Sequence, residues 1–404
     1  MDKTSKLTTE PYKGVRDFYP EDMAIQNYIF DVWRKTAESF GYVEYSASPL
    51  EPTELYKAKS GEEIINEQTY SFKDRGDREV TLRPEMTPTV ARMIAGQRRE
   101  MKFPQRWFSI PNCFRYERPQ KGRLREHFQF NCDIFGVAQI EAEVEIISLL
   151  FSVLKNFGLK PENFKIGVNS RESIYQTIKN LGVKDEDVEK VRGLLDKKNK
   201  IKNFDEELEK IIGKKVDIKI EESDDVKELI KKLHKKGITN VFFDESLVRG
   251  FDYYTGIVFE FSDTNEANPR ALCGGGRYDN LLSIFGVDPI PTVGFGMGDV
   301  TIRDVLETYD LLPEYTSKTA IAILPFSLKQ FEYADMVATT LRATQNVSVD
   351  YSEKKIGDKI SKADKEGIKQ IIVIGEEEVA SGILKIKNLE TKEEVTVTLK
   401  EIIK

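Results

Sequence analysis

Apolar positions in the first three quarters of the chain alternate between helical and strand spacing. Near the start, Ile25, Ile29 and Trp33 recur every four residues, as the buried stripe of a helix does. Five segments with helical spacing are predicted as helices: residues 21–40, 88–96, 141–157, 278–285 and 299–309. Eight segments with period-two alternation or short apolar runs are predicted as strands: residues 42–50, 69–72, 78–82, 106–116, 126–136, 240–243, 257–261 and 293–298.

The pattern changes over residues 170–237. Lys and Glu become dense, aromatic residues thin out, and apolar residues such as Val188 and Val191 keep helical spacing. We interpret this segment as an inserted helical module, which divides the first domain into residues 1–169 and 238–312.

A linker over residues 311–318 is followed by strands and helices in alternation. This order predicts a small α/β domain with a partly parallel sheet over residues 318–404. Five lysines on or beside one of its helices could face the phosphates of an RNA, or form an ordinary solvated surface: Lys354, Lys355, Lys359, Lys362 and Lys365.

Length and charge narrow the class of protein. A chain of 404 residues exceeds one ordinary core, which suggests two or three domains. The net charge of -7 weighs against a protein that coats nucleic acid non-specifically, although a local basic patch would suffice for a nucleic-acid substrate. The only histidines are His127 and His234, so a catalytic triad or a multi-histidine zinc site is not expected.

The cellular location is predicted from three features. Residues 1–12 lack the apolar core of a signal peptide, and the longest strongly apolar stretch, residues 146–154, is far shorter than a membrane span of about 20 residues. The three cysteines are odd in number and show no CxxC spacing, which argues against a disulfide framework. We therefore expect a cytoplasmic protein without a membrane segment.

A basic loop joins the predicted strands 106–116 and 126–136. Its five cations repel one another, so the loop would gain from a polyanionic partner: Arg115, Arg118, Lys121, Arg123 and Arg125. Arginine forks suit phosphate oxygens in particular. A solvated basic hairpin is the simpler alternative for such a run of charge.

A second cluster places Arg249 beside Tyr253 and Tyr254, between two predicted strands. Alone this pattern is weak, because a tyrosine pair is more often partly buried packing. The glycine run at residues 274–276 would let the backbone approach a ligand closely, or would form a plain loop. Neither a strand–GxGxxG–helix pattern nor a GxxxxGK[ST] loop is present, so side chains must hold any ATP.

Together these stretches resemble the class II aminoacyl-tRNA synthetases, and the histidyl-tRNA synthetase family in particular. Residues 114–123 resemble motif 2 of that class, residues 247–255 resemble the histidine-specific signature, and residues 45–55 resemble motif 1, which in this family lies at a dimer interface. The resemblance implies an α+β fold, in which helices flank an antiparallel sheet of the class II synthetase type. It also implies a helical insertion and a C-terminal α/β domain of the anticodon-binding type.

The resemblance implies a role in binding ATP for several residues. Arg115 would contact the α-phosphate and the histidine carboxylate, near which Gln129 would also lie. Glu117 would meet the adenine or its ribose side, and Arg123 the outer phosphates, which would carry Mg2+. Arg249 would bind histidine and stabilise the α-phosphate as the carboxylate attacks. No protein side chain is expected to ligate a metal ion.

The resemblance also implies a pocket for histidine itself. Glu85 and Thr87 would hold the α-amino group, while Asp133, Tyr253 and Tyr254 would bind the imidazole. A buried carboxylate facing the imidazole would discriminate against non-polar rivals, because these would leave it unpaired.

The implied function is ATP-dependent formation of histidyl-adenylate and transfer of histidine to tRNA(His) by a homodimer. One alternative is a catalytically inactive, synthetase-like paralogue that serves as a regulatory subunit or an RNA-binding sensor. Another is a synthetase for a different amino acid, against which the Arg249–Tyr254 signature speaks.

One position departs from the family pattern. Residues 294–301 resemble motif 3, in which an arginine that clamps ATP usually follows three residues after the last glycine, but the chain has Thr301 there. Arg303 lies two residues further along, about 200° around a helix, and would point elsewhere. Three outcomes are open: another cation holds the ATP phosphates, ATP binds more weakly, or activity is lost.

Overall fold

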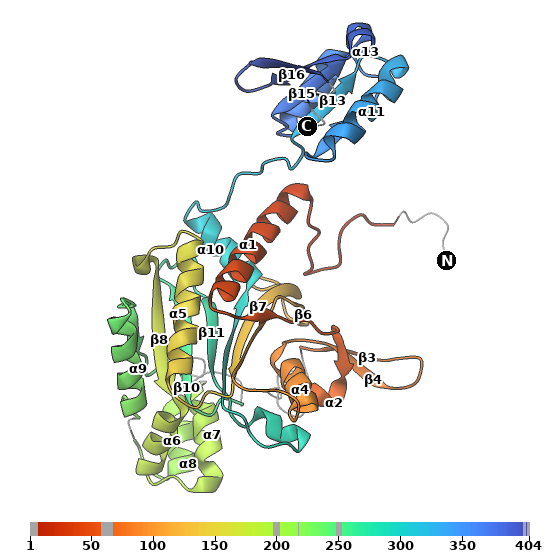
Figure 1. The fold of residues 1–404 in the computed structure, drawn as a ribbon. Helices are drawn as coiled ribbons and strands as arrows, with labels where there is room; N and C mark the ends of the chain where they lie inside the picture. Colours follow the sequence, from red (N-terminus) through yellow and green to blue (C-terminus); the bar gives the residue numbers. More distant parts are fainter. Residues whose placement is uncertain are drawn as a thin grey trace. The chain divides into compact units, whose positions relative to one another are not determined.

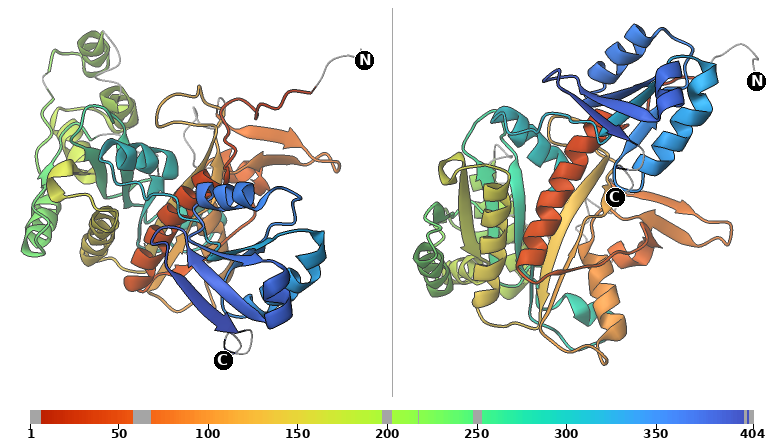
Figure 2. Two further views of the ribbon diagram at one scale, coloured as in Figure 1. Left: turned by 90° about the horizontal axis from the view of Figure 1, so that it is seen from above. Right: turned by 45° about the horizontal axis from the view of Figure 1, so that its top comes forward.

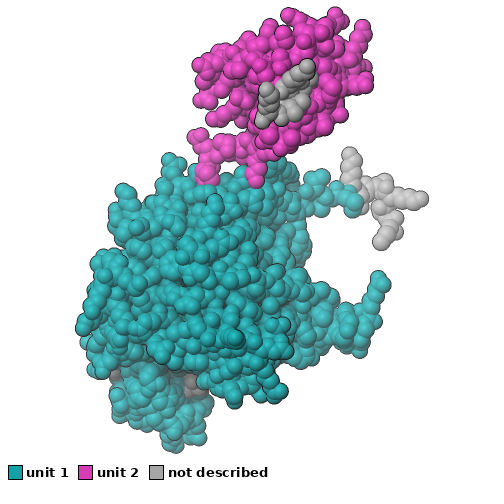
Figure 3. Space-filling model, in the orientation of Figure 1, with its two compact units in different colours: residues 1–312 teal, residues 313–404 magenta. Residues whose placement is uncertain are grey.

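The chain forms two units, residues 1–312 and 313–404, which Figure 3 shows in different colours. The computed structural model describes residues 7–57, 68–196, 203–216, 218–247, 253–398 and 401. No helix among these residues combines the length and apolar character needed to cross a membrane.

The first unit is built on a nine-stranded sheet, counted over the described residues. Its path runs β1-β5-β7-β12-β11-β10-β8-β9, and β6 pairs with β7 beside this path. Pairing is parallel only for β1 with β5 and for β8 with β9, so the predicted antiparallel sheet is confirmed. The strands are β1 (Val43–Glu44), β5 (Gln105–Ser109), β6 (Asn112–Phe114), β7 (Glu126–Phe135), β8 (Phe164–Ser170), β9 (Val241–Phe243), β10 (Ile257–Asp263), β11 (Ala271–Arg277) and β12 (Thr292–Gly298).

Helices cover one face of this sheet: α1 (Pro20–Ser39), α5 (Glu141–Asn156), α9 (Asp224–Lys235) and α10 (Asp299–Thr308) (Figure 1). Their apolar stripes join inward-facing strand residues in one hydrophobic core. Trp33 of α1, for example, stacks on Phe130 of β7 with ring centroids 5.3 Å apart. Helical spacing therefore predicted the buried face of α1 correctly.

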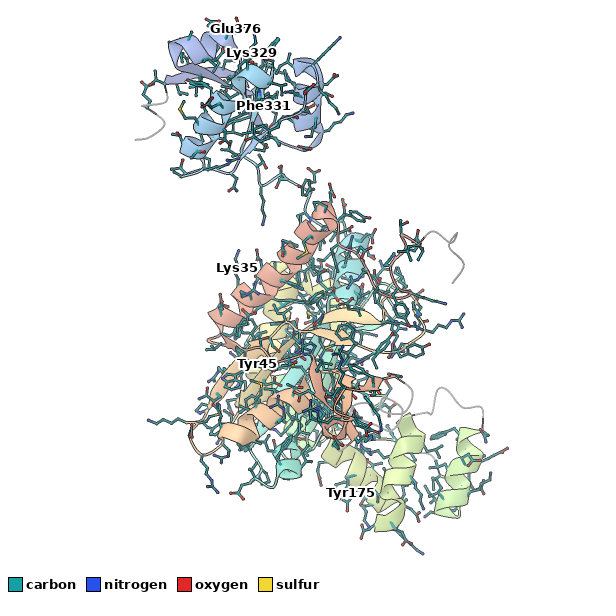
Figure 4. All side chains as sticks on the ribbon, turned by 90° about the vertical axis from the view of Figure 1, so that its right-hand side faces the viewer. Lys35, Tyr45, Tyr175, Lys329, Phe331 and Glu376 are labelled. Carbon is teal, nitrogen blue, oxygen red and sulfur yellow. The ribbon has the colours of Figure 1, made fainter. Side chains whose placement is uncertain are left out.

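The other face carries smaller elements at one end of the sheet. These are α4 (Thr87–Gln97), the 3-10 helix η2 (Leu281–Phe285) and a three-stranded sheet of β2 (Leu50–Pro52), β4 (Glu79–Leu82) and β3 (Tyr70–Lys73), which lies next to α2 (Thr53–Lys57). Tyr45, labelled in Figure 4, packs its ring 5.4 Å from that of Trp107. Only the last part of the predicted helix 278–285 is helical.

Three helices have a hydrophobic core of their own: α6 (Arg171–Asn180), α7 (Asp185–Asp196) and α8 (Phe204–Ile212) (Figure 2). Ile178, Val191 and Leu208 are buried in it, whereas Tyr175 of α6 is exposed (Figure 4). The apolar residues of α9, such as Leu229, belong instead to the main core. The residues expected to form the insertion therefore contribute to two cores.

Two predicted strands are divided in the structure. Residues 42–50 contribute to β1 and β2, which belong to different sheets. Residues 106–116 are divided between β5 and β6 at Pro111, because proline has no N–H to donate to a ladder. Strand β8 was not predicted, although Phe164, Ile166 and Val168 are buried at alternate positions.

The second unit contains a five-stranded sheet of order β14-β13-β15-β16-β17. The first three strands are parallel and the last two antiparallel, which confirms the predicted partly parallel α/β domain. Its elements are β13 (Ile321–Pro325), η3 (Leu328–Gln330), α11 (Phe331–Leu341), β14 (Val347–Val349), α12 (Ile356–Lys365), β15 (Gln370–Ile374), α13 (Glu376–Ser381), β16 (Ile383–Asn388) and β17 (Glu394–Thr398).

Lys359 on α12 differs from the expected RNA-facing lysines. Its side chain is buried, and its Nζ donates to the backbone oxygens of Pro325 at 2.8 Å and Asp350 at 3.2 Å. It also lies 5.8 Å from the ring of Phe331, which Figure 4 labels. Lys359 therefore holds the ends of two strands together and is not available to a phosphate.

Candidate functional site

The floor of the site consists of glycines on the face of the sheet that the large helices leave uncovered. Alternation along β11 and β12 places five of them on this face: Gly274, Gly276, Gly294, Gly296 and Gly298. Neighbouring polar side chains occupy the room that they leave. A Cβ on Gly296 would lie 2.5 Å from Nε2 of Gln129, so a larger residue would force that amide to move. The glycine run 274–276 thus lies in a strand.

An inner pocket of about 480 Å³ lies over part of this floor. Six residues predicted to bind histidine line it: Glu85, Thr87, Gln129, Asp133, Tyr253 and Tyr254. They come from distant elements, because Thr87 begins α4, Asp133 lies on β7, and Tyr253 precedes β10. The structure therefore brings together residues far apart in the sequence.

Two carboxyl groups of the inner pocket already accept hydrogen bonds from tyrosines. The Tyr278 hydroxyl donates to Oδ1 of Asp133, and the Tyr253 hydroxyl donates to Oε2 of Glu85 at 3.2 Å. The ring of Tyr253 lies 5.0 Å from that of Tyr254 and 5.6 Å from that of Tyr278. The pocket thus has an aromatic wall around two oriented carboxyl groups.

Burial changes the proton affinity of Asp133. Desolvation raises the pKa of this carboxyl to about 7, while the hydrogen bond from Tyr278 acts in the opposite direction. The carboxyl therefore changes charge near neutral pH, where a hydrogen-bond donor on a ligand would favour its ionised form.

An outer pocket of about 460 Å³ adjoins the inner one. Its lining includes three arginines together with an acid and a hydroxyl: Arg115, Arg123, Arg270, Glu117 and Thr301. Four polar side chains line both pockets, so a ligand in one would meet a ligand in the other beside them: Arg115, Arg123, Gln129 and Glu260.

The basic loop is docked against the rest of the unit. Its tip is a tight turn in which Gln120 and Arg123 bond through their backbones, and Gly122 supplies the positive φ of 71°. Lys121 Nζ donates to the backbone oxygen of Ala267 at 3.1 Å. The Arg125 guanidinium lies 4.1 Å from the ring centroid of Tyr116. Lys121 and Arg125 thus hold the loop in place, while Arg115 and Arg123 face the pockets.

Glu117 has an unusual environment for an acid. It is buried at 7% exposure and forms an ion pair with Arg123 through Oε2, whereas its Oε1 has no hydrogen-bond partner among the described residues. Buried polar atoms are rarely left without a partner, so Oε1 is a candidate acceptor for a ligand N–H or O–H.

His127 on β7 also lines the outer pocket. Burial, and then the guanidinium groups of Arg115, Arg16 and Arg123, lower the pKa of this imidazole to about 3. It is therefore neutral at pH 7 and adds no charge to the cations around it.

Position 301, which departs from the family pattern, lies in the first turn of α10. Thr301 faces the outer pocket, while Arg303 pairs with Asp22 of α1 at 2.6 Å, so Arg303 points elsewhere as expected. Asp299 is fully buried and accepts hydrogen bonds from Arg16 at 2.7 Å and Gln26 at 3.0 Å. This network fixes the first turn of α10 beside the pocket.

Some residues of the site differ from the prediction. Arg249, predicted as a catalytic residue, lies outside the described residues. Tyr278, Glu260, Arg270 and His127 line the pockets without having been predicted. Within the described part of the chain, no group of three or more His, Cys, Asp or Glu residues is placed to hold a metal ion.

Comparison with known families gives two matches. The family model for histidyl-tRNA synthetase matches residues 14–221 and 201–299. The model for an anticodon-binding domain matches residues 320–404.

Curated relatives match along nearly the whole chain. Histidine--tRNA ligase of Leptospira biflexa is 41% identical over 427 residues and covers 99% of this chain and 97% of the relative. The chloroplastic/mitochondrial histidine--tRNA ligase of Arabidopsis thaliana is 36% identical, and the match covers 98% of this chain and 86% of the relative. Among solved structures, apo histidyl-tRNA synthetase of S. aureus is 26% identical with a TM-score of 0.74, covering 98% of this chain and 99% of that one.

Proposed function

Since the chain belongs to the histidyl-tRNA synthetase family, we propose that it activates histidine with ATP and attaches it to tRNA(His). The observation that carries this proposal is the pair of adjoining pockets, with Arg115, Arg123 and Gln129 on their common border. Histidine occupies the inner pocket and ATP the outer one, so the two reacting groups meet at that border.

The inner pocket selects histidine by its ring. Asp133 accepts a hydrogen bond from an imidazole N–H, and the Tyr278 hydroxyl fixes the direction of that carboxyl group. Glu85 and Thr87 hold the α-amino group, and the tyrosine rings enclose the side chain. An amino acid without a ring N–H would leave Asp133 desolvated and unpaired, which gives strong discrimination.

The border is where the first step takes place. An oxygen of the histidine carboxylate bonds to the α-phosphorus of ATP, the bond from that phosphorus to the bridging oxygen breaks, and pyrophosphate leaves with the electron pair. Arg115 neutralises the charge that grows on the α-phosphate, and Arg249 is proposed as a second cation for that phosphate. Gln129 lies near the substrate carboxylate.

The outer pocket holds the rest of ATP. Arg123 binds the outer phosphates, and Glu117 accepts a hydrogen bond from the adenine or its ribose through the unpartnered Oε1. Mg2+ enters with the triphosphate, whose oxygens are the hard ligands that it prefers, and supplies charge neutralisation. The carboxylate is itself the nucleophile, so the reaction needs none from the protein.

The remaining proposals concern assembly and partners. Residues 318–404 form the anticodon-binding domain, residues 170–237 the insertion, and residues 1–169 with 238–312 the catalytic domain. The three cysteines are buried and free, which fits the cytoplasm.

Residues 45–55 contribute to a homodimer interface, in keeping with the 45% exposure of Leu50. Light scattering coupled to size exclusion tests the dimer, and a monomer at micromolar concentration would reject it.

Amino-acid-dependent exchange of pyrophosphate into ATP tests the activity. With Mg2+ and each of the common amino acids in turn, exchange should rise above background with histidine alone, and transcribed tRNA(His) should then become charged. Arg249→Ala should remove most of the exchange while histidine binding persists. Background exchange by the folded protein would favour an inactive synthetase-like chain, and exchange with a different amino acid would reject the histidine assignment.

A further inference from the structure

The outer pocket has a third arginine that comes from outside the basic loop. Arg270 lies just before β11, and its side chain reaches the tip of the loop at Gly122. A Cβ on Gly122 would lie 2.8 Å from Cδ of Arg270 and 3.6 Å from Cγ2 of Thr301. Arg270 and Thr301 therefore approach the same point of the pocket from two different elements.

The hydrogen bonds of Arg270 leave its charged end available. Nε donates to the backbone oxygen of Lys121 at 3.1 Å, which fixes the direction of the side chain. The terminal nitrogens have no hydrogen bond or ion pair within the described part of the chain. Arg123, by contrast, is already paired with Glu117.

The guanidinium groups of Arg270 and Arg123 line the same pocket and act on each other. Burial, and then the charge of Arg123, lower the pKa of Arg270, while the smaller effect of Glu117 acts in the opposite direction. A polyanion between Arg270 and Arg123 would relieve this repulsion and gain from both cations.

We propose that Arg270 binds the outer phosphates of ATP and supplies the cation that the chain lacks at position 301. This inference rests on the proposed use of the outer pocket by ATP. We assign Arg270 to the phosphates rather than to the adenine base because two guanidinium groups in one pocket suit a group with several negative oxygens. Glu117, by contrast, offers the base an acceptor. The cation that is missing at position 301 of α10 is thus supplied by the residue just before β11.

A purely structural role for Arg270 makes a different prediction. Together with Lys121, whose Nζ donates to Ala267, Arg270 also clamps the loop tip. Loss of that clamp would disturb everything the loop touches, including Arg115 and the binding of adenosine monophosphate. A role on the outer phosphates would affect only nucleotides that carry them.

Calorimetric titration of the full-length chain with Mg2+–ATP and with AMP separates these roles. Arg270→Gln should weaken ATP binding roughly 10- to 100-fold, the range expected for losing a hydrogen bond to a charged group, and leave AMP binding almost unchanged. Equal losses for ATP and AMP, or no loss for ATP, would overturn the assignment. Arg303→Gln removes a paired arginine from α10 outside the pocket and should change neither.

The decisive experiment restores a cation to the pocket from its other side. Thr301→Arg, added to Arg270→Gln, should restore most of the ATP affinity, since it returns a cation but cannot rebuild the hydrogen bond to Lys121. An ATP affinity that stays low in the double variant, with AMP binding normal, would overturn direct contact with phosphate. Because binding is measured without histidine or tRNA, a failure of the proposed ligase activity would be recognised separately, in the exchange assay.

Discussion

The two adjoining pockets share one floor of glycines but achieve affinity by different means. In the inner pocket, each of two buried carboxyl groups receives a tyrosine hydroxyl, and aromatic rings close the wall. In the outer pocket, arginines stand close together, and one oxygen of Glu117 has no partner in the described part of the chain. The inner pocket is organised before its ligand arrives, whereas the outer pocket gathers cations that a polyanionic ligand would bring together.

This difference shows where specificity and binding energy come from. A pocket with oriented partners rejects a wrong side chain, because any mismatch leaves a buried acid unsatisfied. A pocket of clustered cations attracts triphosphate strongly but is less demanding about which side chain supplies each charge. A substitution such as Thr301 is therefore easier to accommodate in the outer pocket than at Asp133.

The largest effect is expected where the two pockets meet. Arg115→Ala should lower the turnover of pyrophosphate exchange about 1,000-fold, because the charge growing on the α-phosphate loses a positioned donor. Histidine affinity, measured by calorimetry, should fall far less, because Arg115 meets only the carboxylate of histidine, whereas the inner pocket holds its ring and α-amino group. Arg118→Ala is the matched control, since Arg118 is an exposed cation of the same loop that lines neither pocket. A loss of turnover in both variants would mean that loop charge in general, and not this border position, controls the step.

A smaller effect, confined to the inner pocket, should follow Asp133→Asn. The amide cannot provide the same charged acceptor, so kcat/KM for histidine should fall about 100-fold. The ATP affinity of the same variant should stay at the wild-type value, which makes it an internal control. If ATP binding fell in parallel, the two pockets would not be energetically separate, and the contrast between them would be wrong.

Sequence patterns could predict much of this site. Helix geometry placed Arg303 away from the position of Thr301, and the pairing with Asp22 agrees with it. Alternation along β11 would also have found Tyr278, which continues the face of Gly274 and Gly276. Glu85 was predicted only from the resemblance to a known family, because no local pattern shows which distant segment its side chain will meet.

Arg270 could not be predicted in the same way. The register between β10 and β11 shifts between Phe261 and Ser262, so alternation counted back from Gly274 fails before it reaches residue 270. Contacts made by a side chain at such an irregularity depend on how the loop tip at Lys121 folds over it. Tertiary packing, which one-dimensional spacing does not contain, decides its direction.

The smallest effect concerns the pH dependence of the inner pocket. With the pKa of Asp133 raised to about 7, a proton competes with histidine for this carboxyl, so KM for histidine should rise as pH falls through neutrality. Between pH 8 and pH 6 the rise due to Asp133 should be about tenfold. Burial raises the pKa of the nearby Tyr278, Tyr254 and Tyr45, which keeps these phenols uncharged over this range.

Two measurements isolate the titration of Asp133. The ratio of KM in wild type to that in Asp133→Asn cancels the protonation of histidine itself, and a ratio that does not vary with pH would contradict the assignment.

The stability of the folded protein provides a second measurement of the Asp133 titration. Because the folded pKa lies above the ordinary value of about 3.9, the unfolded chain holds fewer protons between pH 4 and pH 7. As pH rises from 4 to 7, the free energy of unfolding of ligand-free wild type should therefore decline relative to that of Asp133→Asn. Above pH 7 the two free energies should run parallel. The buried carboxyl of the proposed histidine pocket is thus expected to reduce the stability of the empty protein. A decline of equal size in the variant would place the titrating group elsewhere.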